Sequence, residues 1–346
     1  MADSRLKSEG QVGLKEIARA CNVSLMTVSR AFRENAVIKP ATREMILKKA
    51  GELGYLPAIH KGRPTAPAEN PSDQIQLIFG NFSGNMYYFH MRLLTALEQQ
   101  FAENGYECII RTCNGIYDIF VRLLERVRND HSMHTVILGS FQPEQLEQLL
   151  LAAPGALLLD NHVRPAFQGK YTKLAFDNRR AAYLAVTHLV QCSRRRILLL
   201  TGSENHFFSR EMLMGYTDAL ADCQLEFDPR LVLNADFSAS SAADVMRYVF
   251  SENIQFDAVF TNDEMATGVY RILHERNLSI PEMVSVCGCD DLPVGEQLYP
   301  ELTTIALDYN ELAACAVNHI LSGKSSTVFP EIKLPPYLRI KKSTVF

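Results

Sequence analysis

Apolar residues near the amino terminus recur with the period of short amphipathic helices. Residues 14–21 carry Leu, Ile, Ala and Cys at i, i+3, i+4 and i+7, which places them on one helical face. Residues 22–24 predict a tight turn, because Asn tolerates left-handed backbone and Ser24 is a good N-cap. Residues 25–32 and 40–54 predict two further helices. The residues expected to be buried in these two helices are Val28, Phe32, Ile46, Ala50 and Leu53.

Residues 58–73 lack any hydrophobic period and are rich in Pro, Gly, Ala, Ser and Thr, so they predict a linker. Beyond them, apolar runs typical of buried strands alternate with amphipathic helical segments. The strand candidates are 75–80, 107–111, 135–140, 156–160, 196–201, 257–261 and 284–288. The helix candidates are 91–104, 117–129, 143–152, 180–191, 210–221, 240–252 and 264–276.

This alternation predicts parallel sheets covered by helices on both faces, and its length favours two lobes. We therefore expect a small all-α head on an α/β body. The predicted domains are a tail (1–10), a helix-turn-helix domain (11–57), a hinge (58–73) and a two-lobed domain (74–346). In the last, the N-lobe takes residues 74–175 and 306–335, and the C-lobe takes residues 176–305 and the closing strand.

Composition and the known signature motifs exclude several classes of protein. With 47% hydrophobic and 21% charged residues the chain is globular, and the eight scattered cysteines predict reduced thiols of a cytoplasmic protein. No apolar run is long enough to span a membrane. No sequence motif indicates a nucleotide cofactor, a metal site or a catalytic centre, so we expect no cofactor, no metal and no enzymatic activity.

The charge of the chain is divided unevenly along its length. Residues 14–63 hold ten Lys/Arg and four Asp/Glu, a balance of +6, whereas residues 64–346 carry −10. A basic head on an acidic body predicts that the head alone meets a polyanion such as double-stranded DNA.

Two helices joined by a three-residue turn form a DNA-binding motif when the second helix can enter the major groove. Arg30 is expected to reach a guanine or a phosphate, and Thr27 and Ser29 to contact phosphates. Leu25 and Met26 either touch thymine methyl groups or pack on the protein. The full set of candidate DNA contacts is Leu25, Met26, Thr27, Ser29, Arg30, Arg33, Lys61 and Arg63.

Several motifs in order resemble the lactose/galactose repressor (LacI/GalR) family over nearly the whole chain. The matching segments are Leu14–Ser24, Thr27–Phe32, Thr42-Arg43, Leu53–Pro57, Val284–Asp291, Pro300–Ile305 and Leu338–Thr344. By this resemblance the base-reading positions fall on Leu25, Met26 and Arg30. The hinge departs from the family, because Pro64 stands where a Leu wedges into the minor groove and Gly62 disfavours a helix. Lys61 and Arg63 can still reach phosphates.

The resemblance also implies a periplasmic-binding-protein fold with a small-molecule effector between the lobes. Asp290 and Asn262 match the family's ligand positions, and Asp160 ends another strand candidate. Arg210 lies near the family's usual Arg, whose own position holds Met212. Tyr87, Tyr88 and Phe89 follow the first strand, where the family has a ligand-stacking aromatic residue.

Structural roles compete with each of these assignments. Asp263 is expected to be an N-cap, Asp160 and Asp291 could cap helices or pair with Arg, and Tyr87–Phe89 could form interlobe core. The sequence as a whole predicts a DNA-binding transcription regulator, a repressor and a symmetric homodimer, allosterically controlled by a sugar or sugar acid. The alternatives are a sugar-binding protein whose head serves another partner, and a regulator that senses a partner protein.

Overall fold

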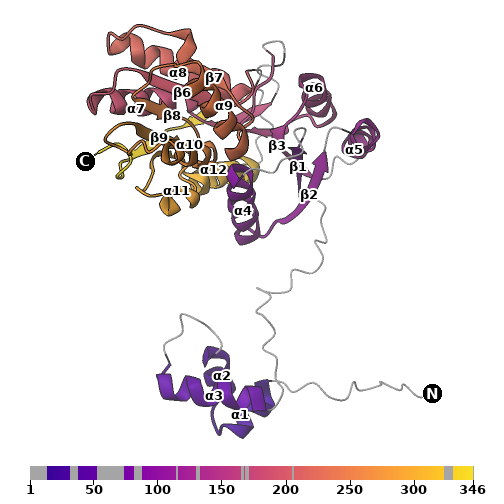
Figure 1. The fold of residues 1–346 in the computed structure, drawn as a ribbon. Coiled ribbons are helices and arrows are strands. Elements are labelled where there is room, and N and C mark those ends of the chain that lie inside the picture. Colours follow the sequence, from indigo (N-terminus) through magenta and orange to yellow (C-terminus); the bar gives the residue numbers. More distant parts are fainter. Residues whose placement is uncertain are drawn as a thin grey trace, which may run out of the picture. The chain divides into compact units, whose positions relative to one another are not determined.

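The computed structural model describes the chain as two units, residues Met1–Pro67 and Ala68–Phe346. The described residues are 14–31, 38–52, 74–81, 88–113, 116–129, 133–164, 167, 171–204, 206–322 and 330–345 (Figure 1). The predicted tail and hinge, with Lys61 and Arg63, lie outside them. No helix among these residues has the length and apolar content needed to cross a bilayer.

The first unit, which we call the head, is a three-helix domain formed by α1 (Leu14–Ala20), α2 (Leu25–Ala31) and α3 (Pro40–Glu52). Its core contains the predicted Ile17, Val28, Ile46 and Ala50, and also Ala31, which was not predicted. The predicted Ala18 and Cys21 are half-buried against this core. The turn between α1 and α2 contains Asn22 at a φ of 51°, as expected of a tight turn. Ser24 begins α2 by accepting the Thr27 N–H at 3.1 Å. Phe32 and Leu53 lie outside the described residues.

The second unit contains two six-stranded sheets, one in each lobe. The N-lobe sheet has the order β11-β5-β4-β3-β1-β2 and is parallel throughout. Its strands are β1 (Gln74–Asn81), β2 (Glu107–Cys113), β3 (His134–Ser140), β4 (Leu157–Leu159), β5 (Thr172–Phe176) and β11 (Glu331–Leu334).

The C-lobe sheet has the order β12-β10-β9-β8-β6-β7, and only β12 runs antiparallel. Its strands are β6 (Ile197–Thr201), β7 (Val232–Asn234), β8 (Ala258–Phe260), β9 (Ser285–Cys289), β10 (Thr303–Ala306) and β12 (Tyr337–Arg339). This parallel architecture with a helical head confirms the predicted fold class.

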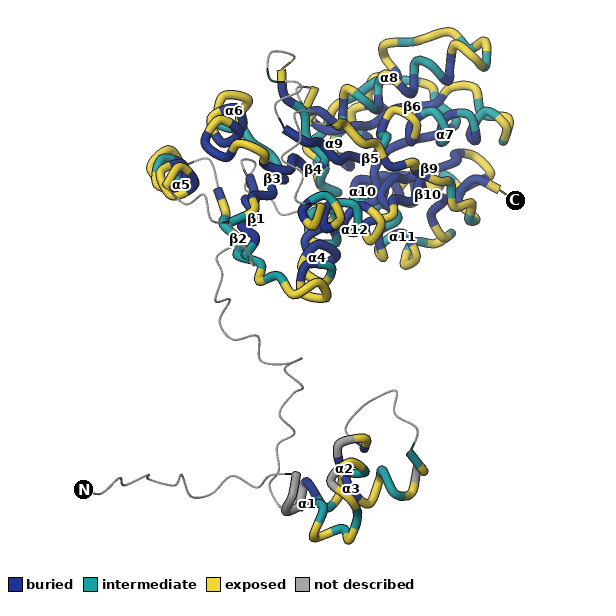
Figure 2. The backbone as a smooth tube through the Cα atoms, turned by 180° about the vertical axis from the view of Figure 1, so that it is seen from behind, coloured by how far each residue is buried: buried dark blue, intermediate teal, exposed yellow. Residues whose placement is uncertain are grey.

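Helices cover both faces of each sheet, and the strands between them are the most deeply buried segments (Figure 2). On the N-lobe sheet, α4 (Tyr88–Glu103) and α12 (Tyr309–Leu321) pack on one face, and α5 (Tyr117–Asn129) and α6 (Pro143–Ala152) on the other. On the C-lobe sheet, α7 (Asn178–Gln191) and α8 (Phe207–Asp222) cover one face. The opposite face carries α9 (Ala239–Ser251) and α10 (Asp263–Glu275), and the short α11 (Val294–Gln297) follows β9.

The chain crosses between the lobes three times, after β5, after β10 and after β11. The strand predictions missed β5, β7, β10 and β11. Strand β5 contains a Lys, β11 contains Glu and Lys, and β7 has three residues, so none of these gives a long apolar run. Helices α4 and α8 each begin three residues earlier than predicted, at Tyr88 and Phe207.

Glycine 215 sets the spacing between α7 and α8. A Cβ at this position would lie 2.0 Å from the Arg179 carbonyl oxygen and 2.8 Å from Ala182 Cβ. Because both neighbours belong to a packed helix, Gly215→Ala should lower the free energy of unfolding by about 1–3 kcal/mol. Chemical denaturation should show this loss but almost none for Met214→Ala, whose side chain is exposed. Equal stability of the two variants would contradict this packing.

Candidate functional site

Helix α2 buries one side and exposes the other. Val28 and Ala31 face the core of the head, while Met26 is 65% exposed and Arg30 is exposed. Thr27 is half-buried, and its hydroxyl lies 2.8 Å from that of Ser24. The exposure of Met26 argues against the alternative that this side chain packs on the protein.

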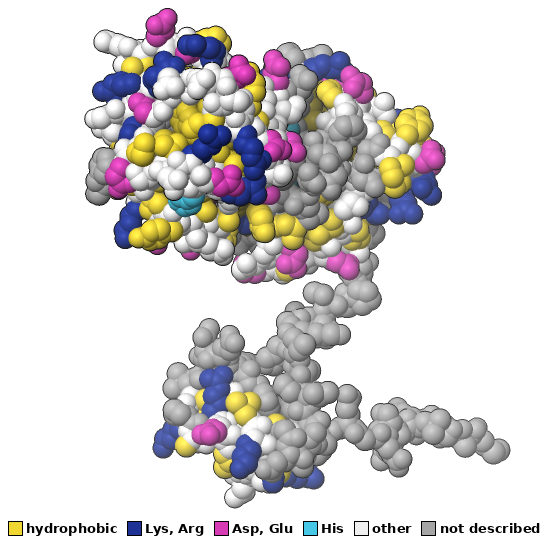
Figure 3. All heavy atoms as spheres, in the orientation of Figure 1, with side chains coloured by type: hydrophobic (Ala, Val, Ile, Leu, Met, Phe, Trp, Pro, Cys, Tyr) yellow, Lys and Arg dark blue, Asp and Glu magenta, His cyan; other side chains and the backbone are white. Residues whose placement is uncertain are grey.

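The remaining candidate DNA contacts cannot all be placed. Leu25 and Ser29 belong to α2, but their side chains lie outside the described set, as does Arg33 entirely. Dark blue basic side chains outnumber acidic ones on the described surface of the head (Figure 3). Its basic residues with described side chains are Arg19, Arg30, Lys39, Arg43, Lys48 and Lys49, against the single acid Glu44. This balance suits a polyanionic partner.

Asp290 follows β9 in a strained and buried position. Its φ is 104°, a region that residues other than Gly rarely adopt, and it is 3% exposed. Burial raises the pKa of its carboxyl group well above the usual range, and the charges of Asp263 and Asp160 add to the rise. Its backbone carbonyl accepts the Tyr309 hydroxyl at 3.1 Å. Strain and burial of this kind are typical of functional positions.

Asp160 ends β4 in the N-lobe and also has positive φ, 39°. Its Oδ1 accepts the Phe176 N–H at 3.3 Å. Burial of the carboxyl group raises its pKa to about 6, although the Phe176 N–H and the Lys173 charge oppose the rise. Asp160 therefore binds the last residue of β5 and neither caps a helix nor pairs with an Arg within the described residues, whereas Asp291 does pair with Arg339. The charge of Asp160 also reaches Asp290 across the lobes.

Asn262, which follows β8, is the N-cap of α10, and its Oδ1 accepts the Met265 N–H at 3.0 Å. The prediction that Asp263 is this N-cap is wrong, because Asp263 is already the first residue of the helix and points to other donors. Its carboxylate accepts the Leu292 N–H and the Thr304 hydroxyl, each at 2.6 Å. The Asn262 side-chain nitrogen makes no hydrogen bond within the described residues.

Arg210 is an exposed residue in the first turns of α8. Its charge contributes to the lowered pKa values of His206 and His162, behind the larger effect of burial; for His206 the value is about 4. Arg210 therefore lies beside these imidazoles. Met212, which occupies the family's usual Arg position, is buried in the helix–sheet core.

The aromatic candidates separate into different roles. Phe89 packs edge-on against Phe176 and tilts against Tyr309, at centroid distances of 6.3 and 5.7 Å. All three residues belong to the N-lobe, so Phe89 packs on the core of that lobe, and these contacts do not support the interlobe-core alternative. Tyr88 is 61% exposed, and its backbone N–H bonds the Glu264 carboxylate of the C-lobe. Tyr87 lies outside the described residues.

Several interlobe residues were not predicted. Phe207 stacks on His162 of the N-lobe with ring centroids 5.8 Å apart. Phe237 has a φ of 69°, and a Cβ at Gly202 would lie 2.0 Å from its ring, so the ring covers the carboxyl end of β6. The sequence offered one signal for Phe237, an aromatic residue between Asp236 and the helix N-cap Ser238.

Buried polar atoms without partners lie near the carboxyl ends of the C-lobe strands. Among the described residues they include Oγ1 of Thr201 and Thr261, Oγ of Ser209 and Oε2 of Glu264. Buried hydroxyl groups are normally hydrogen-bonded, so a ligand or water is expected to satisfy them. We call Asp160, Asn262, Asp290 and these atoms the interlobe site.

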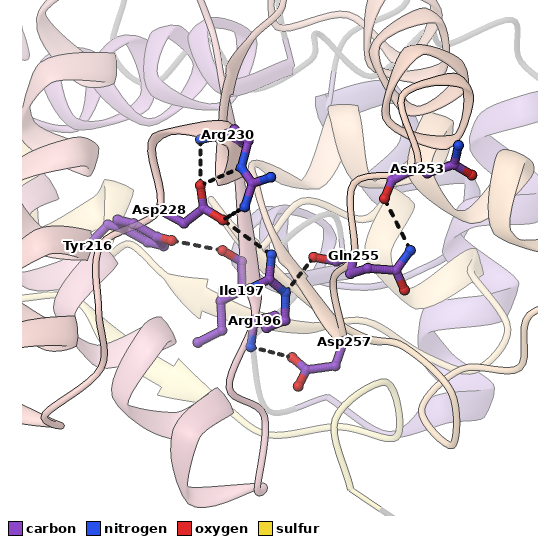
Figure 4. Close-up of polar contacts among 8 residues, drawn as sticks. All are labelled: Arg196, Ile197, Tyr216, Asp228, Arg230, Asn253, Gln255 and Asp257. Carbon is purple, nitrogen blue, oxygen red and sulfur yellow. Dashed lines mark hydrogen bonds and ion pairs between the residues drawn. The ribbon is translucent and has the colours of Figure 1, made fainter.

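The opposite, amino-terminal edge of the same sheet is tied together by ion pairs (Figure 4). Asp228 accepts Arg230 at 2.8 Å and Arg196 at 3.2 Å, and Asp257 accepts the Arg196 N–H at 3.0 Å. The Tyr216 hydroxyl donates to the first carbonyl of β6 at 2.9 Å. Since these groups pair with one another, we assign this edge a structural role. The strained and unpartnered groups lie at the carboxyl edge.

Two family models match the chain. The model described as bacterial regulatory proteins, lacI family, matches residues 13–58, and that of the periplasmic binding protein-like domain matches residues 186–344. Among curated proteins, the regulator GalR of Escherichia coli is 27% identical over 323 residues, covering 92% of this chain and 91% of GalR. The repressor CytR of the same species is 28% identical, covering 87% and 86%.

Two solved structures share the whole architecture. The transcriptional regulator CelR in complex with cellobiose has a TM-score of 0.70 at 24% identity, covering 96% of this chain and 100% of that one. The lac repressor dimer bound to operator and an anti-inducer has a TM-score of 0.69 at 24% identity, covering 97% and 100%. At this identity the likeness supports the fold.

The raised pKa of Asp160 predicts a pH dependence of stability. Its pKa is about 6 in the folded chain against 3.8 ordinarily, so ionisation opposes folding and this contribution is lost as pH rises from about 4 to about 7. Asp160→Asn cannot ionise but keeps an acceptor for Phe176. The free energy of unfolding of Asp160→Asn, relative to that of wild type, should therefore increase by about 2 kcal/mol between pH 4 and pH 7.

Denaturation at several pH values measures this gain, with the exposed Asp244→Asn as a control that should track wild type. A constant difference between Asp160→Asn and wild type from pH 4 to 7 would show that Asp160 titrates normally.

Proposed function

We propose that this chain, whose residues 13–58 match the lacI family of bacterial regulatory proteins, represses transcription by binding an operator as a homodimer. A small polyol, a sugar or sugar acid, bound at the interlobe site controls this binding. The observation that carries the DNA-binding role is the exposed side of α2, where Arg30 and Met26 project from a helix with a buried opposite side. A short second helix of this geometry fits the major groove.

Three features support a polyol at the interlobe site. Burial disfavours the charged form of Asp290, and ligand hydroxyl groups that donate to this carboxyl group would favour that form. The Asn262 side-chain nitrogen has no partner among the described residues and can donate. The unpartnered hydroxyls of Thr201 and Thr261 add donors and acceptors close to them. The Phe237 ring supplies an apolar surface for the carbon face of a sugar. That CelR has been solved with cellobiose is consistent with this assignment.

The two lobes provide a means of control. Hydrogen bonds from Tyr309 to the Asp290 carbonyl and from Tyr88 to Glu264 join the lobes beside the site. A ligand that binds one lobe orientation better than another shifts the population of that orientation. The change in orientation would then alter the spacing of two heads in a dimer.

Arg30→Ala should weaken binding to the operator by roughly 1–3 kcal/mol, because a bidentate base contact is lost. The operator is first identified by selecting bound genomic fragments, and affinity is then measured against it and against a scrambled duplex. Arg19→Ala removes the same charge from the exposed surface of α1 and is the matched control. Arg19→Ala should lower the affinity for both duplexes by the same factor. Arg30→Ala should reduce the ratio of operator affinity to scrambled-duplex affinity. An unchanged ratio in Arg30→Ala would remove this residue from base recognition.

Asp290→Asn should weaken binding of the effector by about 1–3 kcal/mol, because the amide offers ligand hydroxyl groups one acceptor oxygen in place of the two oxygens of a carboxyl group. Asn tolerates positive φ, so the backbone is expected to persist. Calorimetry against neutral sugars and sugar acids measures the loss, with the exposed Asp244→Asn as control. If wild type binds no member of the panel while it still binds its operator, the effector is a partner protein instead.

A further inference from the structure

A cavity lies at the hinge between the lobes, and its lining contains none of the residues of the interlobe site. It has a volume of about 500 Å³, within the range of small-molecule pockets. We call it the hinge pocket. It lies among α4, the start of α12 and β12, and its polar lining comprises Arg92, Gln99, Asp291, Asn310, Tyr337 and Arg339.

Two of the three crossings between the lobes form its walls. Leu307 and Asp308 belong to the crossing after β10, and Tyr337 begins β12 directly after the crossing that follows β11. A ligand in the hinge pocket would therefore contact the segments that must bend when the lobes reorient. Domain hinges are typically a few residues of this kind at the ends of elements.

Arg92 is a half-buried cation without a carboxylate partner. Its guanidinium group lies 4.5 Å from the centre of the Tyr309 ring, and its hydrogen bond goes to the Asp291 backbone carbonyl. No acidic side chain among the described residues lies within ion-pair distance of it. The Asp291 carboxyl group lies near enough for the charge of Arg92 to lower its pKa, but it makes no ion pair with Arg92, so a bound anion would give this guanidinium group a direct charged partner.

The acidic groups of the pocket are already engaged. Asp291 pairs with Arg339 at 2.9 Å, and Asp308 accepts the Glu311 N–H at 2.9 Å as the N-cap of α12. The first N–H groups of α12, a helix of 13 residues, have no partners within the helix and carry partial positive charge. Anion-attracting groups therefore reach the pocket from two elements, α4 and α12.

We propose that the hinge pocket binds a second small ligand, an organic anion that presents a carboxylate or phosphate group to Arg92 and the first turn of α12. Met91, Ala96 and Leu307 contact its carbon skeleton. Binding at the hinge pocket does not depend on the proposed function, and its regulatory effect does, because Asp291 joins the pocket to Asp290 of the interlobe site.

Calorimetry on the full chain tests the site with inorganic phosphate, citrate and glucose 6-phosphate, and with glucose as the uncharged control. At least one anion should bind, and Arg92→Met should lower the affinity for that anion tenfold or more. Arg126→Met removes the same charge from α5, on the other face of the N-lobe sheet, and should leave the affinity unchanged.

Asn310→Asp provides a second variant that keeps the fold, since an acidic residue in the first turn stabilises a helix. The added negative charge should also weaken binding of the anion tenfold or more. The proposal is overturned if no anion binds, or if Arg92→Met and Asn310→Asp bind as wild type does.

Discussion

The buried carboxylate of Asp263 fixes the loop on which both proposed sites depend. It holds the Leu292 N–H and the Thr304 hydroxyl at 2.6 Å, so it ties the turn after β9 to β10. Gly288 makes room for it, because a Cβ there would lie 2.0 Å from Asp263 Oδ1. Burial raises the pKa of Asp263 to about 7 even though both hydrogen bonds oppose the rise. The strained backbone of Asp290, between these anchors, persists because the surroundings determine it on both sides.

This anchored turn is also where the C-lobe meets the N-lobe. The Asp290 carbonyl accepts Tyr309 at 3.1 Å, and the Asp291 carbonyl accepts Arg92. Both donors come from N-lobe helices, while the carbonyls come from a C-lobe loop, so a change in the lobe angle must stretch or exchange these bonds. Bonds of this kind give a two-lobed protein discrete orientations instead of a continuous range, since a buried carbonyl or hydroxyl must be paired in each one.

The sequence allowed the fold class to be predicted because binary patterning survives in long elements such as α5 and β3, and because several motifs in order resemble one family. It could not show strands such as β5 and β11, where a Lys or Glu interrupts the apolar run. Asp290 and Asp160 were found because they end apolar runs. Phe237 and His162 were missed, since residues far apart in the chain meet only when the lobes form. Residues from four separate segments of the chain line the hinge pocket, so no local sequence pattern predicts it.

A shared dipeptide makes independence of the two sites physically implausible if both bind as proposed. Asp290 faces the interlobe site, and Asp291 lines the hinge pocket through its pairing with Arg339. Neither residue can rotate alone, because both have positive φ between the same anchors. An anion that draws Arg92 away from the Asp291 carbonyl would release one of the bonds that hold the lobe angle. By linkage, any effect of that anion on effector affinity must be matched by an equal effect of the effector on anion affinity.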